Sequence, residues 1–164
     1  MLTRKMVAPR NHCGVSVLAR PSLRFLHAYW QVYRALAARV EDGLQARHGL
    51  DLRDLIALGQ LLEPGCRTPS DLARALSLPK YVVSRTLERL NALDALTHSP
   101  DPQDARRQLY TLTPAGHALL ERALVSVDQQ VGPLLDELGE RQAQLTALLH
   151  DLLAASGAPL QETP

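Results

Sequence analysis

Side chains of the kinds that bind nucleic acids recur at helical spacing between residues 80 and 91. The apolar residues of this stretch, expected to face a core, are Val83, Leu87 and Leu90. The opposite face then carries the polar residues Lys80, Tyr81, Ser84, Arg85 and Glu88, with Arg89 at its flank. On such a face Arg85 can bind guanine through two hydrogen bonds, and Lys80 can neutralise a phosphate. The pattern predicts a helix that enters the major groove of DNA; a solvated helix face is the alternative.

A second basic group follows about 20 residues later. Arg106 and Arg107 stand at the end of a proline-marked segment, 100–107, between two short strand-like runs, 95–99 and 108–112. We expect a hairpin with these arginines at its tip, where they suit a narrow and electronegative minor groove. Asp104 is placed to orient a guanidinium. A surface turn with a weak Asp–Arg pair is the alternative.

Residues suited to other chemistry are isolated from one another. The two cysteines, Cys13 and Cys66, form no Cys-x-x-Cys pair and are too few for a disulfide framework or a four-ligand zinc site. Both are candidates for redox sensing, since Cys66 is next to Arg67 and Cys13 follows His12. The six histidines are scattered singly, and the sequence has no hydrolase, phosphate-loop or dinucleotide-binding motif. We therefore predict neither an enzyme nor a cofactor or metal site.

Length, composition and charge agree with a DNA-binding helical protein. The chain has 164 residues, 46% of them hydrophobic, which suffices for one globular domain overall. Residues 1–113 carry 16 Lys/Arg against 10 Asp/Glu, whereas residues 114–164 carry 2 against 7. The basic part is expected to face a polyanion. With no membrane-length apolar run and no secretory signal pattern, the predicted location is cytoplasmic, without a membrane partner.

The periodicity predicts the elements that position these residues. A basic arm, 1–21, precedes a long amphipathic helix over 22–48, whose seam is long enough to pack against helices of a second subunit. Shorter helices over 51–63, 68–76 and 79–91 follow, and the last two make a helix-turn-helix. After the hairpin, one helix begins at Thr113-Pro114, another follows Gly132-Pro133, and a tail spans 157–164.

The stretches LARALSLPKYVVSRTLERLNAL, from Leu72, and DPQDARRQLYTLTPAGHALL, from Asp101, resemble the multiple-antibiotic-resistance regulator (MarR) family of bacterial winged-helix repressors. The most specific part is Asp101-Pro102-x-Asp104-x-Arg106, with Leu112-Thr113 and Gly116 at fixed spacing. The chain departs from the family pattern twice. Asp94 replaces a glycine, at a position where Asp can adopt the left-handed backbone, and His98 replaces an arginine, which removes a permanent charge at the wing base.

The resemblance implies a mainly α fold with a small β-hairpin wing. A winged helix-turn-helix over 50–113 would be flanked by the N-terminal dimerisation helix, 22–48, and C-terminal dimerisation helices, 114–156. It also implies a homodimer on double-stranded DNA, at a pseudo-palindromic operator with half-sites about 34 Å apart. Release by a small-molecule effector, often an aromatic acid, is implied as well.

Tyr29 and Tyr33 are then candidate walls of the effector pocket, with Arg53 a candidate carboxylate partner. An aromatic stripe in a core or subunit interface is the alternative for the two tyrosines. Two other functions remain open: a cysteine-based redox-sensing regulator on the same scaffold, and a helical interaction protein that has lost DNA binding.

Overall fold

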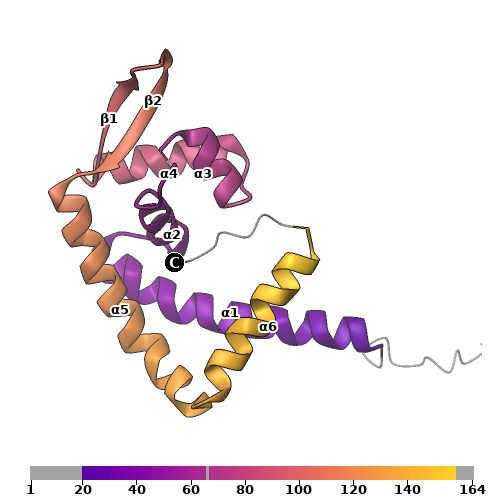
Figure 1. Ribbon diagram of the computed structural model, residues 1–164. Helices are drawn as coiled ribbons and strands as arrows, with labels where there is room; N and C mark the ends of the chain where they lie inside the picture. The colour runs from indigo at the N-terminus through magenta and orange to yellow at the C-terminus, as the bar shows by residue number, and fades with distance from the viewer. Residues whose placement is uncertain (1–19, 66, 158–164) are drawn as a thin grey trace, which may run out of the picture. The chain divides into compact units, whose positions relative to one another are not determined.

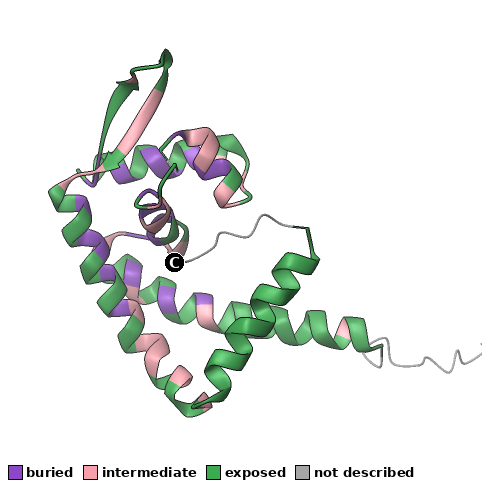
Figure 2. Ribbon diagram, viewed as in Figure 1, coloured by how far each residue is buried: buried purple, intermediate pink, exposed green. Residues whose placement is uncertain are grey.

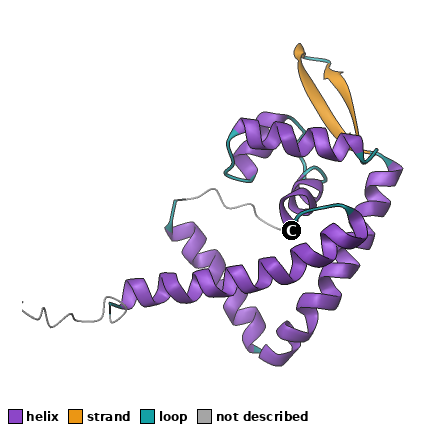
Figure 3. Cartoon of the chain, turned by 180° about the vertical axis from the view of Figure 1, so that it is seen from behind, coloured by secondary structure: helices purple, strands orange, loops and turns teal. Residues whose placement is uncertain are grey.

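The computed structural model describes residues 20–65 and 67–157, which form six helices and one two-stranded antiparallel hairpin (Figure 1). The helices are α1 (Pro21–His48), α2 (Leu52–Gln60), α3 (Pro69–Ala75), α4 (Lys80–Ala92), α5 (Pro114–Leu138) and α6 (Arg141–Ala155). The strands are β1 (Leu96–Asp101) and β2 (Asp104–Leu112). The predicted fold class, mainly α with a small β-hairpin, is confirmed (Figure 3). None of the helices in the described ranges could span a membrane.

The chain forms two compact units, Met1–Ala35 and Leu36–Pro164, and the division falls inside α1. The burial of the α1 seam changes at the same place. Residues Ala37, Val40 and Leu44, within the second unit, are buried. In the first unit the seam residues Leu26, Trp30 and Tyr33 are exposed, Trp30 by 56%. The apolar residues predicted to line one side of α1 are therefore buried only in the second half of the helix.

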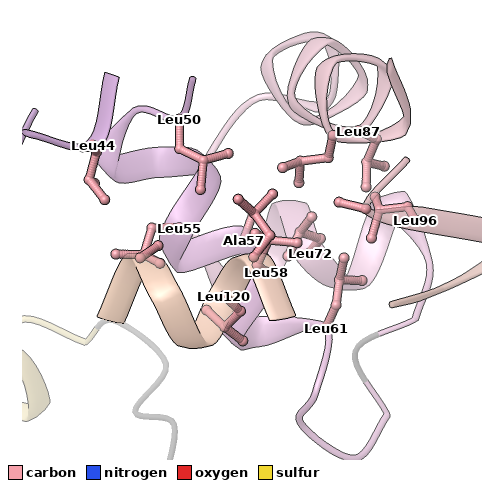
Figure 4. Packing of buried hydrophobic residues seen from close by; sticks show 14 of the residues in the cluster. Leu44, Leu50, Leu55, Ala57, Leu58, Leu61, Leu72, Leu87, Leu96 and Leu120 are labelled. Atoms are coloured by element: carbon pink, nitrogen blue, oxygen red, sulfur yellow. The ribbon is translucent and has the colours of Figure 1, made fainter. Parts of the chain in front are cut away.

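The core of the second unit is a cluster of leucine and smaller aliphatic side chains from α2, α3, α4, α5, β1 and the end of α1 (Figures 2 and 4). The predicted inward residues of α4, Val83, Leu87 and Leu90, are all buried. In α2, Leu55 and Leu58 are buried, whereas Ile56 is 45% exposed. That helix ends at Gln60 rather than at the predicted Glu63, because the chain turns before Pro64-Gly65.

Side-chain caps fix where the helices of this unit begin. The Thr68 hydroxyl accepts a hydrogen bond from the Asp71 N–H at 3.1 Å, and Pro69 occupies the first turn of α3. The Thr113 hydroxyl caps α5 in the same way through the Gly116 N–H at 2.9 Å. At α2, Asp51 and Asp54 each bind the other's backbone N–H, which completes a reciprocal capping box.

Two predicted boundaries are wrong. The helix that begins at Pro114 does not stop at Gly132-Pro133 but runs on to Leu138, with Pro133 inside it. The chain breaks at Gly139 instead, where φ is +53°, a left-handed value that glycine adopts without a Cβ clash. The hairpin strands also extend further than predicted, so the connection between them is reduced to residues 102–103.

The end of α1 is attached to α5 through His48. The His48 Nε2 and the Ser126 Oγ lie 2.8 Å apart, and the Ser126 hydroxyl donates its proton to the Arg122 carbonyl oxygen at 3.1 Å. His48 Nε2–H is therefore the donor to Ser126. Burial lowers the pKa of His48, and the positive charges of Arg122 and Arg47 lower it further.

We expect the His48 imidazole to make folding stability pH-dependent. A lowered folded-state pKa favours the neutral ring, so its contribution is complete above the ordinary value of about 6.5 and is lost as the pH falls below that value. Urea unfolding between pH 7.5 and 5.5 measures this slope. His48→Gln should flatten it, whereas His150→Gln, on an exposed position of α6, should leave it unchanged. Equal slopes in the native protein and His48→Gln would contradict the assignment.

Gly116 permits the closest approach between α5 and the base of the hairpin. A Cβ at this position would overlap the Ala95 carbonyl oxygen and lie 2.9 Å from the carbonyl carbon. Because both atoms belong to the backbone, Gly116→Ala should destabilise the protein by about 1–3 kcal/mol. Gly59→Ala, inside α2 with open space around it, should be neutral or stabilising by up to about 1 kcal/mol. Chemical denaturation of both variants checks the difference, and a neutral Gly116→Ala would contradict it.

Candidate nucleic-acid interface

Helices α3 and α4 form the predicted helix-turn-helix, with Ser77 in the turn at a left-handed φ of +52°. All five polar residues predicted for the outer face of α4 are exposed: Lys80, Tyr81, Ser84, Arg85 and Glu88. Tyr81, at 69%, is the most exposed of the large hydrophobic side chains in the described ranges. Within these ranges neither Lys80 nor Arg85 has a carboxylate partner. Their charges are therefore available to an external anion.

Arg89, one helical turn beyond Arg85, is occupied differently. Its Nε and Nη2 donate to the Asp54 Oδ1 at 3.2 and 2.6 Å, and Nη2 also donates to the Asp51 Oδ2 at 2.8 Å. The sequence predicts a DNA contact for this guanidinium, whereas the structure places it on two carboxylates at the start of α2. The sequence Asp-Leu-Arg-Asp at the start of α2 indicates a capping box. It does not indicate that Arg89 of α4 binds the same two acids.

The Asp54 carboxylate is fully buried, and its ionisation depends on Arg89. Burial raises the pKa of Asp54, while the hydrogen bonds from the Asp51 N–H and from the Arg89 side chain lower it. For Arg89 the order is reversed: burial lowers its pKa, but hydrogen bonds and Coulomb attraction to Asp54 and Asp51 together raise it. The guanidinium is thus the counter-charge that opposes the cost of burying the Asp54 carboxylate.

The hairpin carries Arg106 and Arg107 on the exposed part of β2, near the turn. Pro100 pairs with Gln108, and Asp101 pairs with Asp104. Residues 105–107 of β2 therefore have no paired residue on β1. The sequence predicts these arginines in a loop at the tip of the hairpin. The structure places them instead within β2, where the strand pairing is irregular. The Asp104 Oδ1 accepts the Arg106 backbone N–H at 3.0 Å. Asp104 therefore fixes the backbone before the arginines, and not a guanidinium as predicted.

The base of the hairpin contains both departures noted in the sequence. Asp94 adopts φ of +54°, the left-handed conformation expected of it, and its carbonyl oxygen accepts the Thr113 hydroxyl at 2.6 Å. His98 is exposed, with its ring 5.6 Å from that of Tyr110. A hollow of about 240 Å³ lies between these rings, α3 and α4. It is lined by Pro69, Ser84, Leu87, Glu88, Asn91, His98 and Tyr110.

Arg53 belongs to the same basic surface as α4. It lines a hollow of about 260 Å³ together with Tyr81, Val82, Arg85, Thr86 and Arg89. The sequence indicated Arg53 only as a carboxylate partner for an effector, because nothing in the spacing brings α2 beside the start of α4. Tyr29 and Tyr33 lie in the first compact unit and Arg53 in the second, so the effector site stays a prediction.

The two redox candidates, Cys13 and Cys66, lie outside the described residues. Tyr29 stacks on Phe25 with ring centroids 6.5 Å apart, and Tyr33 lies 6.2 Å from Trp30. Among the residues that the structure describes, no group of three or more His, Cys, Asp or Glu side chains could hold a metal ion.

The two-helix motif, its exposed basic face and the arginine-bearing hairpin define a winged helix-turn-helix protein. Residues 48–107 match the model of the MarR family. A curated relative, the HTH-type transcriptional repressor NicR of Pseudomonas putida, is 30% identical over 79 residues, which are 48% of this chain and 49% of the relative. The chain thus spans about half the length of that relative.

Solved structures cover more of the chain. A probable transcriptional regulator from Pseudomonas aeruginosa is 29% identical with a TM-score of 0.71, over 81% of this chain and 99% of its own. BpsR of Bordetella bronchiseptica, whose DNA binding is regulated by 6-hydroxynicotinic acid, is 26% identical with a TM-score of 0.70, over 85% and 98%. The chain is thus similar to the MarR family of winged-helix regulators, most directly over residues 48–107. Both NicR and the Pseudomonas aeruginosa protein are named as transcriptional regulators.

Removing the counter-charge of Asp54 should destabilise the protein in a pH-dependent way. Arg89→Met should cost about 2–3 kcal/mol at pH 7.5, less than for a fully buried pair because Arg89 is partly exposed. With the raised pKa of Asp54, protonation as the pH falls removes the unpaired charge, so the cost should shrink at pH 5.0. Urea unfolding at both pH values measures it.

Arg74→Met is the matched control for this loss. Arg74 is largely exposed and pairs only with Asp71 on its own helix, at 3.5 Å, so its replacement should cost under about 0.5 kcal/mol. An Arg89→Met cost as small as that of the control, or equal at the two pH values, would show that the ion pair does not stabilise the buried carboxylate.

Proposed function

We propose that the protein is a sequence-specific DNA-binding transcriptional regulator that acts as a repressor. The observation that carries the proposal is the exposed face of α4, where Lys80 and Arg85 lack carboxylate partners beside Tyr81 and Ser84. A helix with this face suits a major groove, with Arg85 reading a base edge and Lys80 binding a phosphate. Arg106 and Arg107 on the wing suit the adjacent minor groove.

The regulator is proposed to act as a homodimer on a pseudo-palindromic operator. Helix α6 has no buried residue, and its large side chains Leu145, Leu148, Leu149, Leu152 and Leu153 are all exposed. In the first half of α1, Phe25, Leu26, Tyr29, Trp30, Val32 and Tyr33 are likewise exposed. A second copy of the chain would bury both apolar faces. Two winged helices would then reach half-sites about 34 Å apart.

Release from DNA is proposed to follow the binding of a small-molecule effector, with an aromatic acid as the favoured class. One relative supports this class, since 6-hydroxynicotinic acid regulates the DNA binding of BpsR. Tyr29 and Tyr33 offer aromatic walls, and Arg53 offers a guanidinium for a carboxylate. Such a ligand acts only if it binds the DNA-free conformation more tightly than the DNA-bound one.

The protein should bind its own upstream DNA at least about 10³-fold more tightly than random duplex, with affinity that falls steeply as salt rises. Fluorescence anisotropy at two salt concentrations measures both. Arg85→Ala and Arg106→Ala should each cost about 1–3 kcal/mol of specific binding. Arg141→Ala, on an exposed position of α6, should cost nothing. Equal and weak binding to both duplexes would contradict the proposed function.

A further inference from the structure

We infer that Asp51 and Asp54 position the DNA-reading helix by holding Arg89, and that specific DNA binding depends on these two acids. We call Arg89 and the two carboxylates the carboxylate clamp. The inference rests on the proposed function and assigns a role in it to residues that do not themselves touch DNA. It is carried by how the oxygens of the clamp are shared.

Each carboxylate of the clamp divides its two oxygens between α2 and α4. Asp54 accepts the Asp51 backbone N–H through Oδ2, at 3.1 Å, and the Arg89 guanidinium through Oδ1. Asp51 accepts the Asp54 backbone N–H through Oδ1, at 2.8 Å, and the Arg89 Nη2 through Oδ2. The capping box therefore orients both carboxylates before they bind Arg89. The guanidinium is therefore bound to two carboxylates that backbone N–H groups of α2 and its cap hold in place.

The clamp controls the part of α4 that reads DNA. Arg89 stands four residues after Arg85, so the two side chains leave the same side of the helix one turn apart. Hydrophobic packing beneath α4 is non-directional, whereas charge-assisted hydrogen bonds have a fixed geometry. A binding site must be held to within about 0.5 Å and 10–20° for its side chains to be productive. The clamp supplies this restraint on the rotation of α4.

The clamp predicts that neutralising an acidic side chain weakens specific DNA binding, which is the opposite of the usual electrostatic effect. An acidic side chain near a DNA-binding surface repels phosphates, so its neutralisation ordinarily leaves affinity unchanged or raises it. If Asp51 instead positions α4, its neutralisation should weaken specific binding while binding to random duplex stays the same. A direct phosphate contact by Arg89 predicts a different result. Losing that contact would lower the slope of log affinity against log salt concentration, the salt slope, by about 0.9 for each phosphate.

The test compares Asp51→Asn with the native full chain, by anisotropy on upstream and random duplexes at several salt concentrations. Asparagine caps a helix as well as aspartate does, so α2 should remain intact. Its oxygen still caps the Asp54 N–H, but an NH2 group, which only donates, replaces the oxygen that accepts from Arg89. The control is Asp71→Asn, which removes the same charge from another capping box whose arginine partner, Arg74, is on its own helix.

Asp51→Asn should weaken binding to the upstream duplex about 10-fold, the loss expected for one misaligned base contact, with an unchanged salt slope. Asp71→Asn should change neither duplex by more than about 2-fold. Arg89→Lys, which keeps the charge but loses the forked geometry, should behave like Asp51→Asn. Urea unfolding of each variant confirms that the measured protein is folded.

Upstream binding by Asp51→Asn that equals or exceeds that of the native protein would overturn the clamp and leave the proposed function standing. A salt slope reduced by about 0.9 in Arg89→Met, which removes the charge, without an effect of Asp51→Asn, would also overturn it in favour of a phosphate contact. Native protein that does not prefer the upstream duplex would overturn both the clamp and the proposed function.

Discussion

An ionised carboxylate without water around it must be paired, and in this protein that requirement joins two helices. Asp54 is fully buried where α2 begins, and its counter-charge, Arg89, comes from α4, 35 residues along the chain. Neither partner can be removed without leaving a charge or a donor unsatisfied. The same pair also separates the arginines of α4 by role: Arg89 is bound internally, and Arg85, one turn earlier, has no carboxylate partner among the described residues.

Much of the fold follows from local rules that the sequence displays. The caps at Thr68 and Thr113 and the inward residues of α4 were predictable because each depends on neighbours within a few positions. The predicted boundaries are wrong where the same local sequence is compatible with two structures. Gly132-Pro133 has the composition of a helix start, yet the helix continues to Gly139, where the backbone is left-handed. Proline inside a long helix removes one hydrogen bond, which the rest of the helix can tolerate.

The candidate site was predictable where it lies on one element and not where it depends on several. The exposed face of α4 follows from the spacing of its own apolar residues. The positions of Arg53 beside α4 and of Arg89 on Asp51 and Asp54 depend on how α2 packs against α4, which periodicity does not encode. The position of Arg106, among the unpaired residues of β2, depends likewise on the register of the two strands.

The most direct test of the account is a hydroxyl-radical footprint of the protein on the DNA upstream of its own gene. Two winged helices presented by a homodimer predict two protected segments whose centres are about one helical turn, or 10 base pairs, apart. Protection should be related by a pseudo-two-fold axis, since the operator mirrors the symmetry of the dimer. Uniform, unprotected cleavage at concentrations that saturate random duplex would contradict sequence-specific regulation by this protein.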